Sequence, residues 1–581
     1  MKRHALHHAT TVPYAYGRDK DHLFLRLRTA KDDAKSVRVF YRDRYHFRKP
    51  FLLQNLELRH TTPDFDYYEV VIALPRNRYA YYFEIQDREG KRYYYDERGI
   101  REHRKSPMKP FQFPYLAPED LYPGEDWLKE AVCYQIFPDR FRKGEGDAQP
   151  WREGELRPWD SPVTSKGFYG GNLAGIREKL PYLEELGVTL LYLTPVFESS
   201  SNHKYNTKDY LSIDPHFGTL GEFQRLVKEC HDRGIRVVLD AVFNHTGLDF
   251  FAFQDLLTRQ EASPYGTWYH PDAYPVSREK INYYTFAHGI AHMPKLNLGE
   301  AEARAYFLHV ARYWIKEADV DGYRLDVCDE LSHDFLRDLR RAVKEEKAEA
   351  VLIGEIMHEA EAFLDGRELD AIMNYPFRDA QVDFFAKDHL TAESFTGLLQ
   401  EQNVRYREEI VDQMWNLLGS HDTPRFLTEA GGDKAKLKLA AAFQFLYRGV
   451  PYIYYGDEVG LSGGRDPLCR GTMPWDPEKQ DLDLYGFHQF LARLRKTHGV
   501  LVRGTVEFPE VREKAFILAR KDDQEEILAL FNRGTAPEDF SSALMTDHEP
   551  LGNFPSPQRG VVPPLGLLLY RRPITNEEDQ P

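Results

Sequence analysis

Residues 320–327, VDGYRLDV, place an arginine and an aspartate two positions apart near the end of a largely apolar run. Side chains two residues apart on a β-strand share one face, so we expect Arg324 and Asp326 to point the same way. A buried carboxylate is costly without a cation or several donors beside it. Arg324 is therefore predicted to keep Asp326 ionised. The alternative interpretation of these eight residues is a structural ion pair that closes a strand.

Further apolar segments, many of them ending in polar residues, precede and follow this one along the chain. The eight predicted strands cover residues 131–137, 189–193, 237–242, 320–327, 351–356, 371–373, 414–418 and 451–455. Amphipathic helices are predicted at residues 173–186, 220–233, 302–317 and 333–347. Alternation of strand and helix eight times predicts an α/β fold, a (β/α)8 TIM barrel, in which loops at the C-terminal ends of the strands build the active site. A doubly wound parallel sheet is the structural alternative.

The pattern changes along the chain in a way that predicts three domains. Residues 1–123 alternate in short runs with turn residues between them, which predicts an N-terminal β-sandwich. Residues 124–502 hold the predicted barrel, and the long connection at 244–300 after the third strand predicts an inserted subdomain. Alternation resumes in residues 503–581, which predicts a C-terminal β-sandwich.

Composition limits the classes of partner. The chain has 581 residues with 92 acidic and 77 basic side chains, a formal net charge of −15. This charge disfavours nucleic acid and anionic membranes as partners. Cys133, Cys230, Cys328 and Cys469 are too widely spaced to indicate a zinc site or a disulfide framework. The sequence shows neither an apolar leader nor an apolar run of membrane-spanning length, so we predict a cytoplasmic protein.

Polar residues follow four of the predicted strands. They are DAVFNH at 240–245, the Arg324 and Asp326 pair, Glu355, and GSHD at 419–422. Each has a simpler explanation, such as a salt bridge, or a helix N-cap for Asp422. Because the strands of a barrel end at one rim, their convergence favours a catalytic site.

Three carboxylates at one rim fit the requirements of glycosidic bond cleavage. The sequence has no phosphate loop, serine nucleophile elbow or dinucleotide fingerprint that would indicate another chemistry. In the retaining reaction the two working carboxyl groups lie about 5–5.5 Å apart, which suits the ends of neighbouring strands. Asp326 is predicted to attack the anomeric carbon. Glu355, surrounded by like charges, is predicted to have a raised pKa and to protonate the leaving oxygen.

These motifs carry a family resemblance. DAVFNH (240–245), GYRLDV (322–327), GE (354–355) and SHD (420–422) occur in the order found in the α-amylase family of glycoside hydrolases, which this sequence resembles. The resemblance implies Asp326 as nucleophile, Glu355 as general acid/base and Asp422 as transition-state stabiliser. The residues that it implies as sugar contacts are His203, Tyr205, His245, Arg324 and His421.

A narrower resemblance rests on MPKLN at 293–297, which is similar to a motif of the neopullulanase, cyclomaltodextrinase and maltogenic amylase group. That group cleaves α-1,4 bonds in cyclodextrins, maltodextrins and pullulan, often with transglycosylation. DPLCR at 466–470 resembles its segment after the eighth strand, which implies Asp466 and Arg470 as substrate contacts. Glu330 matches a position of the group that is linked to water or acceptor handling.

The resemblance also implies partners and a metal. Many members of the group are homodimers in which the N-terminal domain of one subunit covers the active site of the other. The segment YHF at 45–47 stands where relatives often carry a tryptophan for this purpose. The group often binds calcium, which the resemblance places at Gly170 and Asn172. The predicted chemistry itself requires no cofactor.

Two other functions remain open at this stage. The first is a non-catalytic glycan-binding protein on the same fold, which the presence of all three acids disfavours. The second is a transferase or isomerase that acts on α-glucosides. The products formed from maltotriose would separate a transferase or isomerase from a hydrolase.

Overall fold

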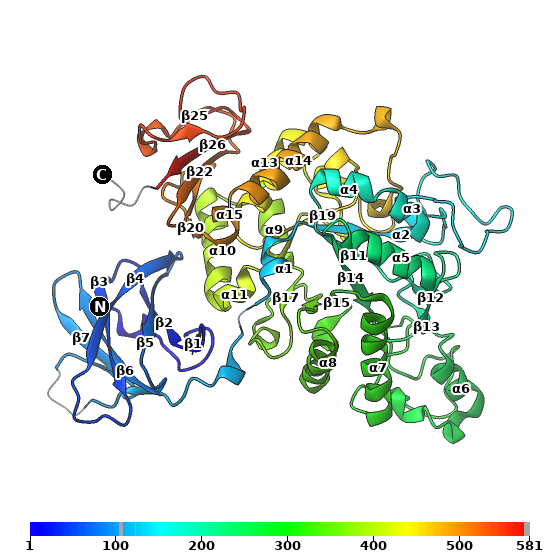
Figure 1. Cartoon of the computed structure of the whole chain (residues 1–581), viewed down its shortest axis with the longest axis horizontal. Coiled ribbons are helices and arrows are strands. Elements are labelled where there is room, and N and C mark those ends of the chain that lie inside the picture. Colours follow the sequence, from blue (N-terminus) through cyan, green and yellow to red (C-terminus); the bar gives the residue numbers. More distant parts are fainter. Residues whose placement is uncertain (104–107, 123, 288, 575–581) are drawn as a thin grey trace. The chain divides into compact units, whose positions relative to one another are not determined.

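The computed structural model describes residues 1–103, 108–122, 124–287 and 289–574 (Figure 1). The chain divides into two compact units. The first comprises Met1–Gly124, Leu364–Gly366 and Glu393–Val411, and the second comprises Glu125–Phe363, Arg367–Ala392 and Asp412–Pro581. The last seven residues of the predicted C-terminal domain, 575–581, lie outside the described part of the chain.

Eight parallel strands form a barrel in the second unit, which confirms the predicted α/β fold class. They are β10 (Cys133–Ile136), β11 (Leu190–Leu193), β14 (Arg236–Ala241), β15 (Gly322–Leu325), β16 (Val351–Gly354), β17 (Ala371–Ile372), β18 (Trp415–Leu417) and β19 (Val450–Tyr454). Their order is β17-β16-β15-β14-β11-β10-β19-β18. A parallel bridge between Met373 and Trp415 joins β17 to β18, so the barrel closes.

Helices surround these strands (Figure 1). They include α3 (Leu173–Glu178), α4 (Leu180–Leu186), α5 (Leu220–His231), α7 (Ala301–Ala318), α8 (His333–Glu346), α9 (Tyr375–Gln381), α13 (Lys434–Leu446) and α14 (Leu482–Thr497). Helix α8 illustrates why they form. The Ser332 side chain caps its first turn by accepting a hydrogen bond from the Phe335 amide, and one face buries apolar residues such as Leu339.

The single helix predicted at residues 173–186 is wrong, because the structure has two helices there. Helix α3 ends at Glu178, and α4 begins at Leu180 with Pro181 in its first turn. Proline has no amide hydrogen, so it cannot continue the hydrogen-bond ladder of a preceding helix but is tolerated at the start of a new one.

The connection between β14 and α7 is long and carries its own structure. It contains α6 (Phe251–Arg259), and isolated antiparallel bridges join His245 to Lys295 and Thr285 to Pro294. These bridges bring the two ends of the insertion together beside the end of β14. The inserted segment is therefore positioned next to the rim of the barrel.

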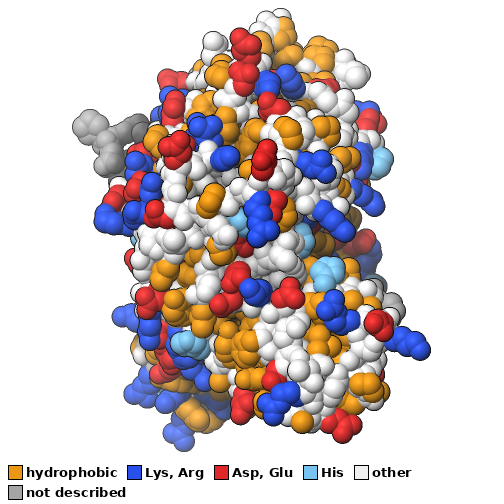
Figure 2. All heavy atoms as spheres, turned by 90° about the vertical axis from the view of Figure 1, so that its right-hand side faces the viewer, with side chains coloured by type: hydrophobic (Ala, Val, Ile, Leu, Met, Phe, Trp, Pro, Cys, Tyr) orange, Lys and Arg blue, Asp and Glu red, His pale blue; other side chains and the backbone are white. Residues whose placement is uncertain are grey.

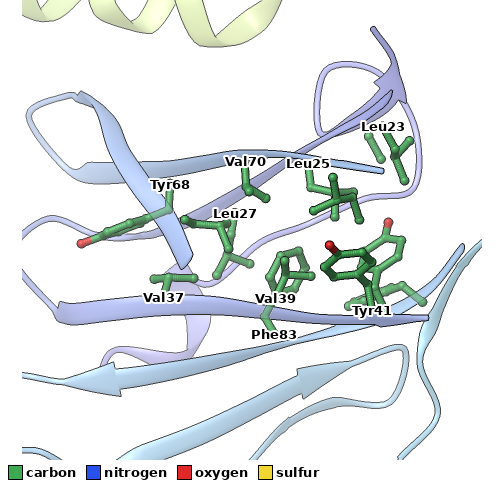
Figure 3. Packing of buried hydrophobic residues seen from close by; sticks show 14 of the residues in the cluster. Leu23, Leu25, Leu27, Val37, Val39, Tyr41, Tyr68, Val70 and Phe83 are labelled. Carbon is green, nitrogen blue, oxygen red and sulfur yellow. The ribbon is translucent and has the colours of Figure 1, made fainter. Parts of the chain in front are cut away.

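The first unit is an antiparallel β-structure. Its strands are β1 (Ala15–Gly17), β2 (His22–Ala30), β3 (Ala34–Asp43), β4 (Leu52–Thr61), β5 (Phe65–Ala73), β6 (Tyr79–Asp87), β7 (Arg92–Asp96), β8 (Gly99–Arg101) and β9 (Phe111–Phe113). Strand β4 pairs with β3 through residues 52–56 and with β5 through residues 57–61, so it passes from one layer to the other. Side chains of the two layers, among them Leu25, Val39 and Phe83, face one another and form the core (Figure 3).

The end of the second unit forms a smaller antiparallel sheet. Its strands are β20 (Thr505–Glu507), β21 (Ala515–Lys521), β22 (Glu525–Asn532), β24 (Glu549–Pro550) and β26 (Gly566–Pro573), and β23 (Glu538–Asp539) pairs with β25 (Val561–Val562). Ile517, Leu530, Phe540 and Leu568 are part of its buried core. This segment therefore has a hydrophobic core of its own.

The surface mixes side chains of all kinds. Figure 2 shows hydrophobic side chains scattered among Lys, Arg, Asp and Glu on the face that it presents. Such isolated exposed apolar residues are normal for a folded chain. Within the described ranges, no helix combines the length and the apolar character that crossing a bilayer requires.

We predict that Gly322→Ala destabilises the barrel. Gly322 begins β15 with φ 145°, and a Cβ there would lie against the backbone of Val351 in the neighbouring strand. Backbone strain and overpacking together are expected to lower the free energy of unfolding by about 2–4 kcal/mol, measured by denaturant titration. The control is Gly486→Ala on the exposed face of α14, where nothing lies within 4 Å, and a gain of about 1 kcal/mol is expected. Equal stability of the two variants would contradict this account of β15.

Candidate active site

Two neighbouring barrel strands deliver two carboxylates to one rim. Strands β15 and β16 are parallel, with Leu325 opposite Gly354. The next residues on each strand, Asp326 and Glu355, therefore leave the barrel side by side, and both line a cleft of about 620 Å³. Of the residues singled out from the sequence, those that line this cleft are His203, Tyr205, His245, Asp326, Glu355, His421, Asp422, Asp466 and Arg470.

Arg324 lies fully buried beneath the cleft and contacts three carboxylates. Its Nη1 donates to Asp240 Oδ1 and to Asp326 Oδ1, both at 2.9 Å, and its Nη2 lies 2.7 Å from Glu355 Oε1. Burial alone lowers the pKa of Arg324, but the charges of Asp240 and Glu355 raise it well above its usual value. Arg324 therefore stays positively charged. Because it contacts carboxylates from three strands, it is more than one half of a structural ion pair at the end of one strand.

The two carboxyls at the rim have raised pKa values. Burial raises the pKa of Asp326 well above its usual value, the charge of Glu355 raises it further, and Arg324 opposes both effects. Burial also raises the pKa of Glu355, as predicted from the sequence, with Arg324 opposing. The sequence predicts that Arg324 keeps Asp326 ionised; Arg324 does lower the pKa of Asp326, but burial and the charge of Glu355 outweigh its effect. Asp326 and Glu355 are expected to titrate as one pair.

One carboxylate oxygen of Asp326 has no hydrogen-bond partner among the described residues. Oδ1 accepts from Arg324, whereas Oδ2 is buried and has no hydrogen-bond partner among the described residues. A buried carboxylate oxygen without a donor is costly, so such atoms are rare outside sites that receive a ligand. Because Asp326 lines the cleft, its carboxylate is placed beside any molecule bound there.

The backbone after β15 orients Glu355. The Val327 amide donates to Glu355 Oε2 at 2.9 Å, and the Cys328 amide donates to the Glu355 carbonyl at 3.1 Å. Val327 adopts φ 47°, a left-handed conformation that is costly for a β-branched residue. Such strain is typical of functional sites, where the surrounding structure holds it in place. Here it directs an N–H group onto the carboxylate.

Asp422 has the opposite electrostatic environment. Its Oδ2 lies 3.0 Å from His421 Nε2, and its Oδ1 accepts from Arg470 Nη2 at 3.0 Å. Although burial raises the pKa of Asp422, His421 and Arg470 lower it far below its usual value. Asp422 is therefore ionised at neutral pH. The alternative role as a helix cap is wrong, because α12 (Phe426–Glu429) begins after Arg425 and has no side-chain cap.

A hydrogen-bonded network fixes the floor of the cleft. The Tyr205 hydroxyl donates to Asp240 Oδ2 at 2.8 Å, and the Tyr205 ring stacks on His421 with 4° between the planes. Gln135 Nε2 lies 2.7 Å from His421 Nδ1, and the Tyr192 hydroxyl donates to Asp240 at 2.6 Å. Sequence analysis missed Gln135 and Tyr192, although a polar group inside an apolar barrel strand is a signal that could have found them. Such second-layer partners hold the contact residues in place.

His203 and His245 line the cleft as neutral rings. Burial lowers the pKa of each histidine to about 3. At His203 the positive charge of Arg470 also lowers the pKa. The His245 ring stacks on Phe286 with centroids 4.9 Å apart. Both histidines therefore offer hydrogen bonds without charge at neutral pH.

Loop residues also line the cleft. Phe286, Ile290, His292 and Met293 come from the inserted segment, and Asp329 and Met357 come from the loops after β15 and β16. Of these six residues, only Met293 belongs to a motif quoted from the sequence, MPKLN at 293–297. Glu330, in contrast, does not line the cleft. It pairs at 2.7 Å with Lys295, which also donates to Asn244.

The residues implied for calcium lie elsewhere and do not fit that ion. Asn172 Oδ1 accepts from the amides of Gly144 and Gly175, and its Nδ2 donates to the Gly144 carbonyl. Asp147 pairs with Arg225 at 2.8 Å. Calcium needs six to eight oxygen ligands. In the described part of the chain no cluster of three or more His, Cys, Asp or Glu is arranged to hold a metal ion.

Comparisons with known proteins match most of the chain to one family. The family model described as alpha amylase, catalytic domain, matches residues 135–489, and the model for the alpha amylase N-terminal ig-like domain matches residues 1–117. A cyclomaltodextrinase from Thermoanaerobacter pseudethanolicus is 41% identical over 93% of this chain and 94% of its own. Neopullulanase 2 from Thermoactinomyces vulgaris is 42% identical over 92% of each chain. A solved cyclomaltodextrinase structure matches with a TM-score of 0.92 at 38% identity, over 98% of this chain and all of that one.

We predict that acid destabilises the fold through its neutral buried histidines. The pKa of His245 is about 3 when folded and about 6.5 when unfolded, so its stabilising contribution is complete above pH 6.5 and is lost as the pH falls. Between pH 7 and 5 this loss is about 2 kcal/mol for one histidine. Denaturant titrations should give a shallower pH dependence for His245→Gln.

The control for this measurement is His309→Gln, on the exposed face of α7. It should keep the pH dependence of the unchanged protein. Parallel stability curves for His245→Gln and the unchanged protein would show that His245 is not neutral in the fold.

Proposed function

This chain belongs to the alpha-amylase family of glycoside hydrolases, and on that premise we propose that it is a retaining enzyme that cleaves α-1,4-glucosidic bonds in cyclodextrins, maltodextrins and pullulan. The names of its relatives, cyclomaltodextrinase and neopullulanase, support this substrate class. The observation that carries the mechanism is the meeting of Asp326, Glu355 and Asp422 in one cleft above Arg324.

The first half-reaction uses the shared proton. Asp326 Oδ2 attacks the anomeric carbon, the bond from that carbon to the leaving oxygen breaks, and Glu355 gives its proton to that oxygen. The raised pKa of Glu355 keeps the proton available until this moment. Asp326 becomes a neutral ester while Glu355 becomes ionised, so the two residues together still carry one negative charge.

The second half-reaction reverses these roles. A water molecule, or a sugar hydroxyl in transglycosylation, gives its proton to Glu355 and attacks the same carbon from the side that the leaving group vacated. The ester breaks and Asp326 recovers its charge. Because each step inverts the carbon, the product keeps the α configuration.

Asp422 is proposed to stabilise the positive charge that develops on the sugar ring. It stays ionised because His421 and Arg470 lower its pKa. An ionised carboxylate in a partly desolvated cleft attracts an oxocarbenium-like centre more strongly than it attracts the neutral substrate. The stacked ring of Tyr205 provides an apolar platform beneath the same sugar.

Homodimer formation, which the resemblance implies, and the cytoplasmic location predicted from the sequence remain proposals. No step of the proposed mechanism uses a metal. Glu330 and its partner Lys295 are proposed to influence the acceptor side, since they lie beside Asn244 next to the cleft.

The direct test compares variants on β-cyclodextrin, pullulan and starch. Glu355→Gln and Asp326→Asn should each lower kcat by about 10³-fold or more, because each removes a group that acts in the transition state. Reducing-sugar release and binding of β-cyclodextrin are measured on the same samples.

The matched control is Glu153→Gln, an exposed carboxylate on a loop, which should keep full activity. Unchanged protein that binds β-cyclodextrin without releasing sugar would instead support a glycan-binding function. Isomers or longer oligomers that dominate from maltotriose throughout the reaction would support a transferase or isomerase.

The pH profile tests the role of the coupled pair. Activity requires one proton on Asp326 and Glu355 together, so it falls when a second proton binds and when the last proton leaves. Ordinary carboxyl groups titrate at about pH 4. Because the pKa values of Asp326 and Glu355 are both raised, both limbs of the kcat/KM profile should lie at a higher pH than that. The residual activity of Glu355→Gln should lack the basic limb, and an unchanged basic limb in this variant would refute the assignment.

A further inference from the structure

A second cavity, of about 630 Å³, lies in the inserted segment between β14 and α7. Its walls include Tyr274, Tyr284, His270, Glu261, Asp272 and Glu300. Within the described ranges, no residue lines both this cavity and the catalytic cleft. The proposed mechanism gives these residues no role.

Two tyrosine rings of this cavity are open to solvent. Tyr284 is 57% exposed and Tyr274 is 39% exposed. The Tyr284 ring packs against His270 with centroids 5.4 Å apart, and its amide donates to the His270 carbonyl at 3.0 Å. The Tyr274 hydroxyl lies 2.8 Å from the position that a Cβ would take at Gly266. The Tyr284 ring is therefore positioned by His270 and the Tyr274 hydroxyl lies beside Gly266, while much of each side chain stays exposed.

Hydrogen-bond acceptors stand beside the rings. Glu261 and Asp272 are exposed carboxylates on the cavity wall, and neither takes part in an ion pair among the described residues. Glu300 adds a third carboxylate at the start of α7. The wall therefore combines the flat tyrosine rings with carboxylate acceptors. Among the described residues, Glu261 and Asp272 have no Lys, Arg or His partner.

This combination selects a neutral ligand rich in hydroxyl groups. Carboxylates on the wall, in a chain of net charge −15, repel phosphates and other anions. A glucose unit has a flat apolar face that can stack on tyrosine and hydroxyl donors at its edge that suit carboxylates. A cavity of this volume is also large enough for a small oligosaccharide.

We propose that this cavity is a second α-glucan-binding site, which holds a maltooligosaccharide or one arm of a longer glucan outside the catalytic cleft. The proposal deepens the proposed function, on which it rests for the identity of the sugar. It adds long α-glucans to the substrates, because a chain held at the inserted segment stays near the rim while other parts of it enter the cleft. Such tethering raises the effective concentration of substrate at the cleft.

The test is calorimetric titration of maltoheptaose into full-length Glu355→Gln protein, which keeps both sites and cleaves slowly. Two binding events per chain are expected. Adding Tyr274→Ala and Tyr284→Ala should weaken one of them by about tenfold or more and leave the other. Tyr284→Phe should keep it, because the stacking surface remains. Tyr115→Ala is the control, since Tyr115 is 54% exposed and lies in the other unit.

One binding event in the parent protein, or two unchanged events after both alanine substitutions, would overturn the proposal. Circular dichroism and thermal melting of each variant separate loss of a site from loss of the fold. A failure of the proposed function has a different signature, because the unchanged enzyme would then release no sugar from β-cyclodextrin whatever the number of maltoheptaose sites. Loss of binding in Tyr284→Phe would show that stacking does not hold the ligand, which also contradicts the proposal.

Discussion

The buried guanidinium of Arg324 is the constraint on which the site depends. It contacts Asp240, Asp326 and Glu355 from three neighbouring strands, and it partly compensates the cost of burying these carboxylates at the rim. Removing one partner of a buried pair typically costs about 3–5 kcal/mol. The barrel supplies the geometry, since parallel strands β14, β15 and β16 place the four groups in register. Arg324 therefore contributes both to the stability of the rim and to the electrostatics of the cleft.

The same cation explains why neighbouring acids behave differently. Burial raises the pKa values of Asp326 and Glu355 although Arg324 contacts and opposes both, so the two acids are expected to hold a proton between them. Asp422 has Arg470 and His421 beside it and stays ionised. Pairs of acids whose environments separate their pKa values in this way mark acid and base assignments. Neutral His245 adds hydrogen bonds without disturbing this balance.

The sequence predicted the barrel well because buried parallel strands are continuous apolar runs with polar residues at their ends. It also predicted which acids would meet, because those ends share a rim. It could not predict that Arg324 would contact three carboxylates at once, because one of them, Asp240, comes from another strand. Residues such as Phe286 were missed because the inserted segment has no periodicity, and the break at Pro181 was missed although a proline inside a helical pattern indicates that the helix ends before it.

The central claim is that Asp326 forms a covalent bond to the sugar while Glu355 handles the proton. Incubating the Glu355→Gln protein with an activated α-glucosyl fluoride supplies a leaving group that needs no acid, so the glucosyl ester should accumulate. Mass spectrometry of the digested protein is the most direct measurement. The account predicts one glucosyl group on the peptide that contains Asp326. Label on a peptide without residue 326, or turnover to β-configured product with no label, would contradict it.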